Sequence, residues 1–163
     1  MLLLDKPYVS DLLINTIRKN NWPVVGTNIA REMAPELQEL FMSDEEAVAA
    51  YEKNPMMYVN SENTISWINE NLGHTKLPEQ VNTFKNKGLF RDMLSDLYPE
   101  FRYKKIEYQN LKAYNPNDFG FPLIIKPAVG FFSMGIYVVE NIQDWNNALT
   151  KLEQELKQVR GIY

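Results

Sequence analysis

Short apolar runs alternate with amphipathic stretches over the first 77 residues. Three of the apolar runs have the length and composition of strands: 2–5, 23–27 and 57–59. Apolar residues at helical spacing follow Ser10, Ser43 and Ser61, each of which can cap a helix. Glu46 completes a capping box with Ser43. Strands that alternate with helices predict a parallel sheet with helices on both faces, so residues 1–77 are expected to form an α/β domain.

The pattern changes from residue 78 onwards. Apolar residues recur at helical spacing between Val81 and Leu97, with an interruption at Gly88, and predict a helical linker. Three strands and a closing amphipathic helix are predicted to follow, at 103–108, 121–125, 136–139 and 145–159. Residues 78–163 are therefore expected to form the linker and a small antiparallel α+β lobe.

The segment GFPLIIKPAVGFFSMGIYVVE, at 120–140, carries the most distinctive chemistry of the chain. Lys126 ends an apolar run that is predicted to be buried, and a buried lysine needs a paired charge, so an anionic group is expected near its ammonium. Gly130 and Gly135 bracket the next residues and allow positive φ, which turns several N–H groups towards one point beside the Ser133 hydroxyl. A cation next to converging amides predicts a phosphate site.

Two common phosphate loops are excluded by the same residues. A Walker A loop needs Lys-Ser or Lys-Thr directly after its second glycine, where Ile136 and Tyr137 stand. The dinucleotide fingerprint opens a helix, whereas this loop leads into an apolar run typical of a strand. The remaining alternatives are a flap that closes over nucleotide phosphates and a plain hairpin with a snorkelling lysine.

The composition is that of an ordinary globular protein. Hydrophobic residues make up 45% and charged residues 23% of the 163 positions, which argues against a disordered chain. The net charge of −4 argues against an extended nucleic-acid interface, which needs a basic face. The one basic cluster, Arg102, Lys104 and Lys105 around Tyr103, is interpreted as the solvated face of a strand. No nucleic-acid partner is expected.

The chain contains no cysteine and a single histidine, His74. Disulfides, thiolate metal sites and thiol nucleophiles are excluded. With one histidine, neither a histidine-rich metal site nor a serine–histidine triad is expected. The opening MLLLD is too short for a secretory leader, and no apolar run approaches the roughly 20 residues that span a bilayer. These features predict a cytoplasmic protein with no membrane partner.

The order of these features resembles the ATP-grasp superfamily. Its members place an α/β preATP-grasp domain before a helix that carries a lysine, and then a strand ending in Ile-Ile-Lys-Pro, a glycine loop and a second strand. Lys87 in FKNKGLFRDML and Lys126 in LIIKPAVG match the two phosphate-contacting lysines. The resemblance implies that ATP is held between two sheets, under a flap at 128–135. The implied nucleotide contacts are Lys87, Lys126, Gly130, Ser133, Met134 and Gly135.

The resemblance also implies a reaction class. Members of the superfamily use ATP to activate a carboxylate as an acylphosphate, which an amine or a thiol then attacks. The adenine-binding hinge and the magnesium ligands of the superfamily follow the helix with which this sequence ends, so magnesium is expected only in a longer protein. No residue here is assigned a catalytic or metal-binding role. Phe131, Phe132 and Met134 also make the flap bulkier than the small-residue flaps common in the superfamily.

Three functions are consistent with the sequence. The first is the amino-terminal portion of an ATP-grasp ligase that joins a carboxylate to an amine or a thiol, and this portion is expected to be inactive by itself. The second is a non-enzymatic binding or assembly module that retains the front of the fold. The third is a small enzyme that acts on a phosphorylated metabolite in the first domain. An incomplete second lobe would leave apolar surface uncovered, so self-association is expected.

Overall fold

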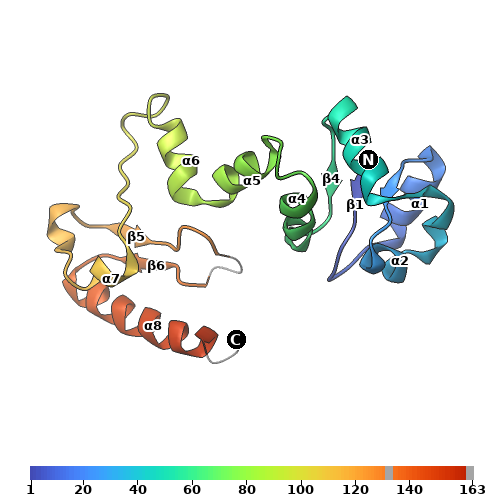
Figure 1. The fold of residues 1–163 in the computed structure, drawn as a ribbon. Coiled ribbons are helices and arrows are strands. Elements are labelled where there is room, and N and C mark those ends of the chain that lie inside the picture. The colour runs from blue at the N-terminus through green and yellow to red at the C-terminus, as the bar shows by residue number, and fades with distance from the viewer. Residues whose placement is uncertain (131–133, 161–163) are drawn as a thin grey trace. The chain divides into compact units, whose positions relative to one another are not determined.

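The chain forms an α/β protein, as the sequence predicts. The computed structural model describes residues 1–130 and 134–160, with side chains up to residue 155. The chain divides into two compact units, Met1–Val81 and Asn82–Tyr163 (Figure 1). Each unit has its own hydrophobic core.

The first unit is built on a four-stranded parallel sheet. Its strands lie in the order β3, β2, β1, β4. The inner strand β1 (Leu2–Leu3) pairs with β2 (Val24–Val25) on one side and with β4 (Tyr58–Val59) on the other, and β2 also pairs with β3 (Phe41–Met42). The predicted parallel sheet is therefore confirmed.

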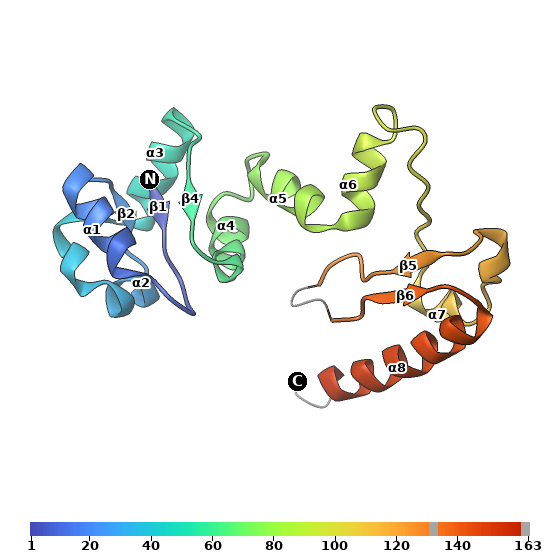
Figure 2. The same ribbon diagram turned by 180° about the vertical axis from the view of Figure 1, so that it is seen from behind.

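Successive residues of β1 and β2 point into different cores. The helices around the sheet are α1 (Asp11–Asn20), α2 (Asn28–Met33), the 3-10 helix η1 (Pro35–Leu40), α3 (Asp44–Lys53) and α4 (Ile65–Asn71). Leu2 and Val24 belong to a cluster with α1, α2 and η1, whereas Leu3 and Val25 belong to a cluster with α3 and α4. Because the side chains of a strand alternate between the faces of a sheet, helices cover both faces (Figure 2).

Two of the three serines predicted to cap helices do so, and the third caps a 3-10 turn instead of the α-helix that follows it. The Ser10 hydroxyl accepts a hydrogen bond from a backbone N–H in the first turn of α1, at 3.2 Å. The capping box at α3 is complete, because Ser43 Oγ accepts from the Glu46 N–H at 3.2 Å and the Glu46 carboxylate accepts from the Ser43 N–H at 2.8 Å. Ser61 caps the 3-10 turn η2 (Glu62–Thr64), which leads directly into α4.

Residues 28–42 contain elements that the sequence analysis does not predict. The helix α2, the 3-10 helix η1 and the strand β3 all lie in this segment. Thr27 caps α2 by accepting a hydrogen bond from the Ala30 N–H at 3.0 Å, and Pro35 opens η1. The three elements are too short for a hydrophobic period to become visible, which explains why the pattern misses them.

The predicted helical linker consists of two helices. α5 (Leu77–Lys85) and α6 (Lys87–Leu94) are separated at Asn86, not at Gly88. The Asn86 side chain accepts hydrogen bonds from the N–H groups of Gly88 and Leu89, at 2.9 and 3.1 Å, and thereby caps α6. The prediction of a break at Gly88 is wrong because the asparagine cap sets the start of the helix, and Gly88 is buried inside its first turn.

The second unit contains the predicted hairpin and closing helix. β5 (Leu123–Ile125) and β6 (Tyr137–Val139) pair antiparallel, with Ile124 opposite Val138. α8 (Ile142–Arg160) packs against β6, and two opposite views show it alongside the hairpin (Figures 1 and 2). The buried core of this unit consists of Leu111, Val139, Trp145 and Ala148. Within the described ranges, no helix is both long and apolar enough to cross a bilayer.

The strand predicted at 103–108 does not form. The segment pairs with no strand of the described ranges and runs into the short helix α7 (Tyr108–Leu111). Tyr103 and Lys105 instead bond through their side chains to Asp92 of α6. The alternation of residues is that of an extended chain, but side-chain bonds to a helix replace the backbone ladder of a sheet.

Candidate phosphate site

The β5–β6 hairpin has two unlike faces. Leu123, Ile125, Tyr137 and Val139 pack in the core with α8. Ile124 and Val138 point the other way and are 54% and 64% exposed. Because alternate residues of a strand face opposite sides, a helix on one side of the hairpin leaves the other side open. We call this open side, with Ile124 and Val138, the open face.

Lys126 follows β5 directly and continues its alternation onto the open face. The Lys126 side chain is exposed, so the prediction that it is buried is wrong. The reason is the single layer of helix cover on the hairpin. Among the described residues, no hydrogen bond or ion pair engages the ammonium of Lys126. The ammonium is therefore free to meet an anion from solution without breaking a bond inside the protein.

The flap, residues 128–135, is described at both ends. Gly135 has a φ of +70°, which residues with a Cβ rarely adopt, and it is buried against Pro127. Gly130 does not have positive φ, so that part of the prediction is wrong. A Cβ at Gly130 would lie 2.8 Å from Pro127 Cγ, so the close approach of the proline ring explains this glycine.

Two predicted contact residues remain in the flap. Met134 is described and is 45% exposed. Ser133 lies outside the described residues, as do Phe131 and Phe132. The arrangement of the flap amides around Ser133 therefore stays a prediction.

Lys87, the other predicted lysine, is joined to the flap by the backbone. It is the first residue of α6, and its N–H donates a hydrogen bond of 2.8 Å to the Ala128 carbonyl oxygen. Lys126 stands two residues before Ala128, a span of at most about 7 Å along the chain. The fold thus brings together two lysines that are far apart in the sequence. The Lys87 side chain is also exposed, with no ion pair to any described group.

The start of α6 offers its amides to the protein rather than to a ligand. The N–H of Lys87 bonds to Ala128, and those of Gly88 and Leu89 bond to the Asn86 side chain. The next amide, that of Phe90, bonds to the Asn86 carbonyl at 2.9 Å. Helix N-termini bind phosphate through free N–H groups, so the lysine side chains, and not this helix end, are the groups suited to an anion here.

Lys105, near the same helix, has a partner of its own. Its ammonium bonds to the Asp92 carboxylate, which also accepts a hydrogen bond from the Tyr103 hydroxyl at 2.7 Å. The bond from Lys105, followed by that from Tyr103, lowers the pKa of Asp92, and the same contacts raise the pKa of Lys105 and of Tyr103. Lys105 is thereby neutralised, which distinguishes it from Lys87 and Lys126.

The chemistry available at the flap is therefore cationic and partly apolar. Two unpaired ammonium groups lie beside an open face with exposed aliphatic side chains. This donor set fits a ligand with phosphate groups and an apolar ring. Within the described part of the chain, no three His, Asp or Glu side chains gather into a group that could hold a metal ion, and we assign none to magnesium.

Comparison with protein families finds a match for the segment that contains the hairpin. Residues 119–163 match the family model described as the ATP-grasp domain. This segment of the chain belongs to an ATP-grasp domain. The matched ATP-grasp segment contains β5, Lys126, the flap, β6 and α8, but not Lys87. Searches of curated proteins and of solved structures found no match to the chain.

Sequence reasoning does not find every part of the candidate phosphate site. The Ala128 carbonyl accepts the hydrogen bond that joins the start of α6 to the flap. A backbone acceptor of this kind cannot be predicted from the side chains in the sequence. Asn86 is the exception, because an asparagine just before a helix is a readable capping signal.

Proposed function

We propose that the second unit binds the phosphates of ATP between Lys126, Lys87 and the flap. The hydrogen bond from the Lys87 N–H to the Ala128 oxygen carries this proposal, because it brings the helix lysine to the flap that follows the strand lysine. The match to the ATP-grasp domain supports a nucleotide as the ligand. Lys87 lies outside the matched segment, so its role rests on the hydrogen bond alone.

The reaction we propose is activation of a carboxylate. A carboxylate oxygen attacks the γ-phosphorus of ATP, ADP leaves, and the resulting acylphosphate is attacked by an amine or a thiol with release of phosphate. Negative charge develops on the phosphoryl oxygens during the first transfer, and fixed cations stabilise it. Lys126 is assigned to this charge, and Lys87 to the other phosphates. We propose that the chain is the part of such a ligase that binds the phosphates. We expect these 163 residues to bind ATP without catalysing the reaction.

Nucleotide titration of variants tests this proposal. Lys126→Gln and Lys87→Gln are each expected to weaken ATP binding about tenfold or more, because each removes a charge-assisted hydrogen bond worth about 1.5 kcal/mol or more. Adenosine, which has no phosphate, should bind equally to all variants. Lys151→Gln, at an exposed lysine of α8, is the matched control.

Two results would contradict the proposal. The first is an absence of ATP binding by the unmodified chain in calorimetry. The second is an equal loss of affinity in Lys151→Gln and Lys126→Gln, which would show a general charge effect. Binding of phosphorylated compounds that survives both Lys126→Gln and Lys87→Gln would favour instead a phosphate site in the first unit.

A second candidate function has its own support. Besides Ile124 and Val138, the flap exposes Val129 and Met134, at 48% and 45%. Exposed apolar side chains around one hairpin are typical of a binding or assembly module. The two candidates differ in what they expect at the open face, which is a nucleotide in the first case and a protein in the second.

A further inference from the structure

A hollow in the first unit is lined only by residues of that unit, between Tyr51 and Gln80. Its volume is about 490 Å³, within the range of small-molecule sites. Its walls come from the end of α3, from Pro55 shortly before β4, and from the turn into α5 with the start of that helix. The lining residues are Tyr51, Glu52, Pro55, Thr75, Lys76, Leu77 and Gln80. Pro55 precedes β4, so the hollow lies at the amino edge of the parallel sheet. Ligands of α/β sheets usually lie at the carboxyl edge.

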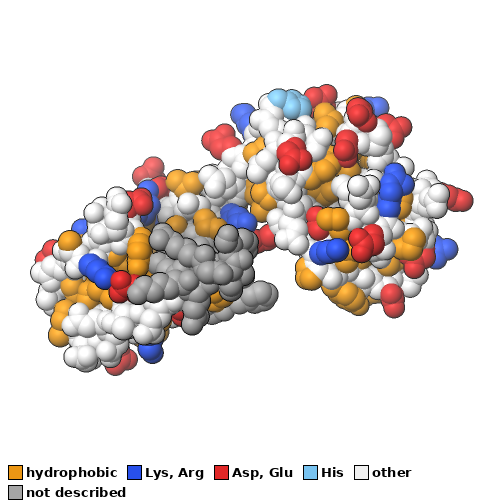
Figure 3. All heavy atoms as spheres, turned by 60° about the horizontal axis from the view of Figure 1, so that its bottom comes forward, with side chains coloured by type: hydrophobic (Ala, Val, Ile, Leu, Met, Phe, Trp, Pro, Cys, Tyr) orange, Lys and Arg blue, Asp and Glu red, His pale blue; other side chains and the backbone are white. Residues whose placement is uncertain are grey.

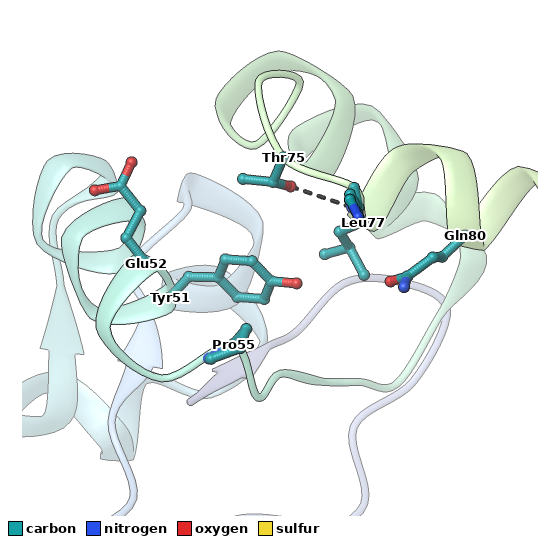
Figure 4. A pocket seen from close by; sticks show the side chains of 7 residues that line it. Tyr51, Glu52, Pro55, Thr75, Leu77 and Gln80 are labelled. Atoms are coloured by element: carbon teal, nitrogen blue, oxygen red, sulfur yellow. Dashed lines mark hydrogen bonds between the residues drawn. The ribbon is translucent and has the colours of Figure 1, made fainter.

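The Tyr51 hydroxyl is the most informative group in the hollow. Tyr51 is only 7% exposed, yet its hydroxyl bonds to none of the described residues. In Figure 4 the hydroxyl points across the hollow towards Gln80, whose side chain points back. No hydrogen bond joins the two groups. The hydroxyl opens into the hollow, where a bound molecule that bridges this gap would bond to both groups.

Two charged side chains line the hollow, those of Glu52 and Lys76. The Glu52 carboxylate points away from the Tyr51 hydroxyl in Figure 4 and pairs with His74 at 2.9 Å. Lys76 is exposed and has no ion pair with any described residue. Because the Glu52 carboxylate is turned away and bonded to His74, Lys76 is the charged group at the hollow that has no partner among the described residues. Apolar walls are supplied by the ring of Tyr51 and by the side chains of Pro55 and Leu77.

We propose that this hollow binds a small organic carboxylate with an apolar body. Lys76 receives the carboxylate, the Tyr51 hydroxyl and the Gln80 carboxamide supply hydrogen bonds, and the apolar body packs on Pro55 and Leu77. The site belongs to the first unit alone and does not depend on nucleotide binding in the second. Its test and that of the ATP site can therefore fail separately.

The test uses 3-phenylpropionate as the probe and its neutral amide, 3-phenylpropionamide, as the matched control ligand. Binding to the full chain is followed by amide chemical shifts in NMR. We expect saturable shifts confined to residues around the hollow, and affinity for the amide at least tenfold lower, because the amide cannot pair with Lys76. Lys76→Gln should weaken the acid about tenfold, and Tyr51→Phe about threefold to tenfold. Lys53→Gln, at an exposed lysine of α3 outside the hollow, should bind as the unmodified chain does.

Three results would overturn the proposal. An absence of saturable shifts at millimolar probe would mean that the hollow holds water only. Equal affinity for the acid and the amide, or an unchanged affinity in Lys76→Gln, would remove the assigned role of the charge. A thermal unfolding curve for each variant shows whether it is folded. If Lys76→Gln does not fold, Tyr51→Phe still tests the site, because it keeps the packing of the ring and removes only the hydroxyl.

Discussion

Tyr137 is the residue whose chemistry is most constrained by the hairpin core. Its hydroxyl is buried under α8, and no hydrogen bond to it is present in the described part of the structure. Burial is the main cause that raises the pKa of Tyr137 to about 12, and the nearby Glu155 carboxylate adds to it. The folded chain holds this phenol strongly in its neutral form.

Tyr137→Phe should change how stability depends on alkaline pH. The pKa is higher in the folded chain than the ordinary value of about 10, so the stabilisation is complete below about pH 10 and is lost as the pH rises towards 12. The full loss is on the order of 3 kcal/mol and should be absent in Tyr137→Phe. At neutral pH the variant should be as stable as the unmodified chain or more so, because it loses no hydrogen bond.

Denaturant unfolding at neutral and alkaline pH measures both effects. Tyr98→Phe, at a tyrosine 61% exposed in the same unit, is the control and should keep the alkaline loss of the unmodified chain. A large loss of stability in Tyr137→Phe at neutral pH would show that the hydroxyl does have a partner, contrary to the structure.

Individual residues were predictable from the sequence where their role is local. Ser10, Ser43 and Glu46 act within one helical turn, and each forms the predicted bond. The exposure of Lys126 was not predictable, because an apolar run looks the same whether helices cover one face of a hairpin or both. Alternation shows which residues share a face, but not what covers that face.

At the scale of elements, the start of α6 links helix formation to the flap. Asn86 fixes where the helix begins, and the first helical N–H, that of Lys87, bonds to the Ala128 oxygen. If the helix began one residue later, this N–H would no longer be held in place. The cap of α6 thus positions Lys87 without touching any ligand itself.

Asn86→Ala should loosen this link. Loss of a capping side chain costs about 1 kcal/mol, and the Gly88 and Leu89 amides lose their acceptor. We expect hydrogen exchange at Leu89 to accelerate about tenfold and ATP affinity to fall. Ser43→Ala is the matched control, because it removes a comparable cap in the other unit. Unchanged exchange at Leu89, or the same acceleration in Ser43→Ala, would contradict this role of Asn86.

Elements were predictable where they are long or carry a cap. The helix α8 shows its amphipathic period in the sequence, and α3 shows its capping box. The two-residue strand β3 carries no period of its own. The segment 103–108 carries the right period but binds Asp92 through its side chains, so the pattern alone could not separate a strand from an extended chain.

At the scale of the whole molecule, apolar side chains reach the surface in the second unit. Ile124 and Val138 form one exposed pair across the hairpin. On α6 and after it, Met93 and Leu97 are exposed by 50% and 72%. Figure 3 shows apolar side chains among the charged ones at the surface of the described part. Such surfaces favour association in water.

We predict that the chain self-associates through the open face. Sedimentation velocity should show mass that rises with protein concentration. The double variant Ile124→Thr with Val138→Thr should remain monomeric, because threonine keeps the β-branched shape but reduces the apolar surface. Met93→Gln with Leu97→Gln is the control for apolar surface elsewhere. A monomer at high concentration, or association that the open-face variant leaves intact, would contradict the prediction.

The bond between Lys87 and Ala128 has a consequence for engineering this site. Both partners are main-chain atoms, so either side chain can be exchanged and the tether survives. Proline at position 87 is the one natural replacement that deletes the donor, and proline is well tolerated at the first position of a helix. Lys87→Pro with Lys87→Gln as reference would therefore separate the mechanical role of this position from its charge.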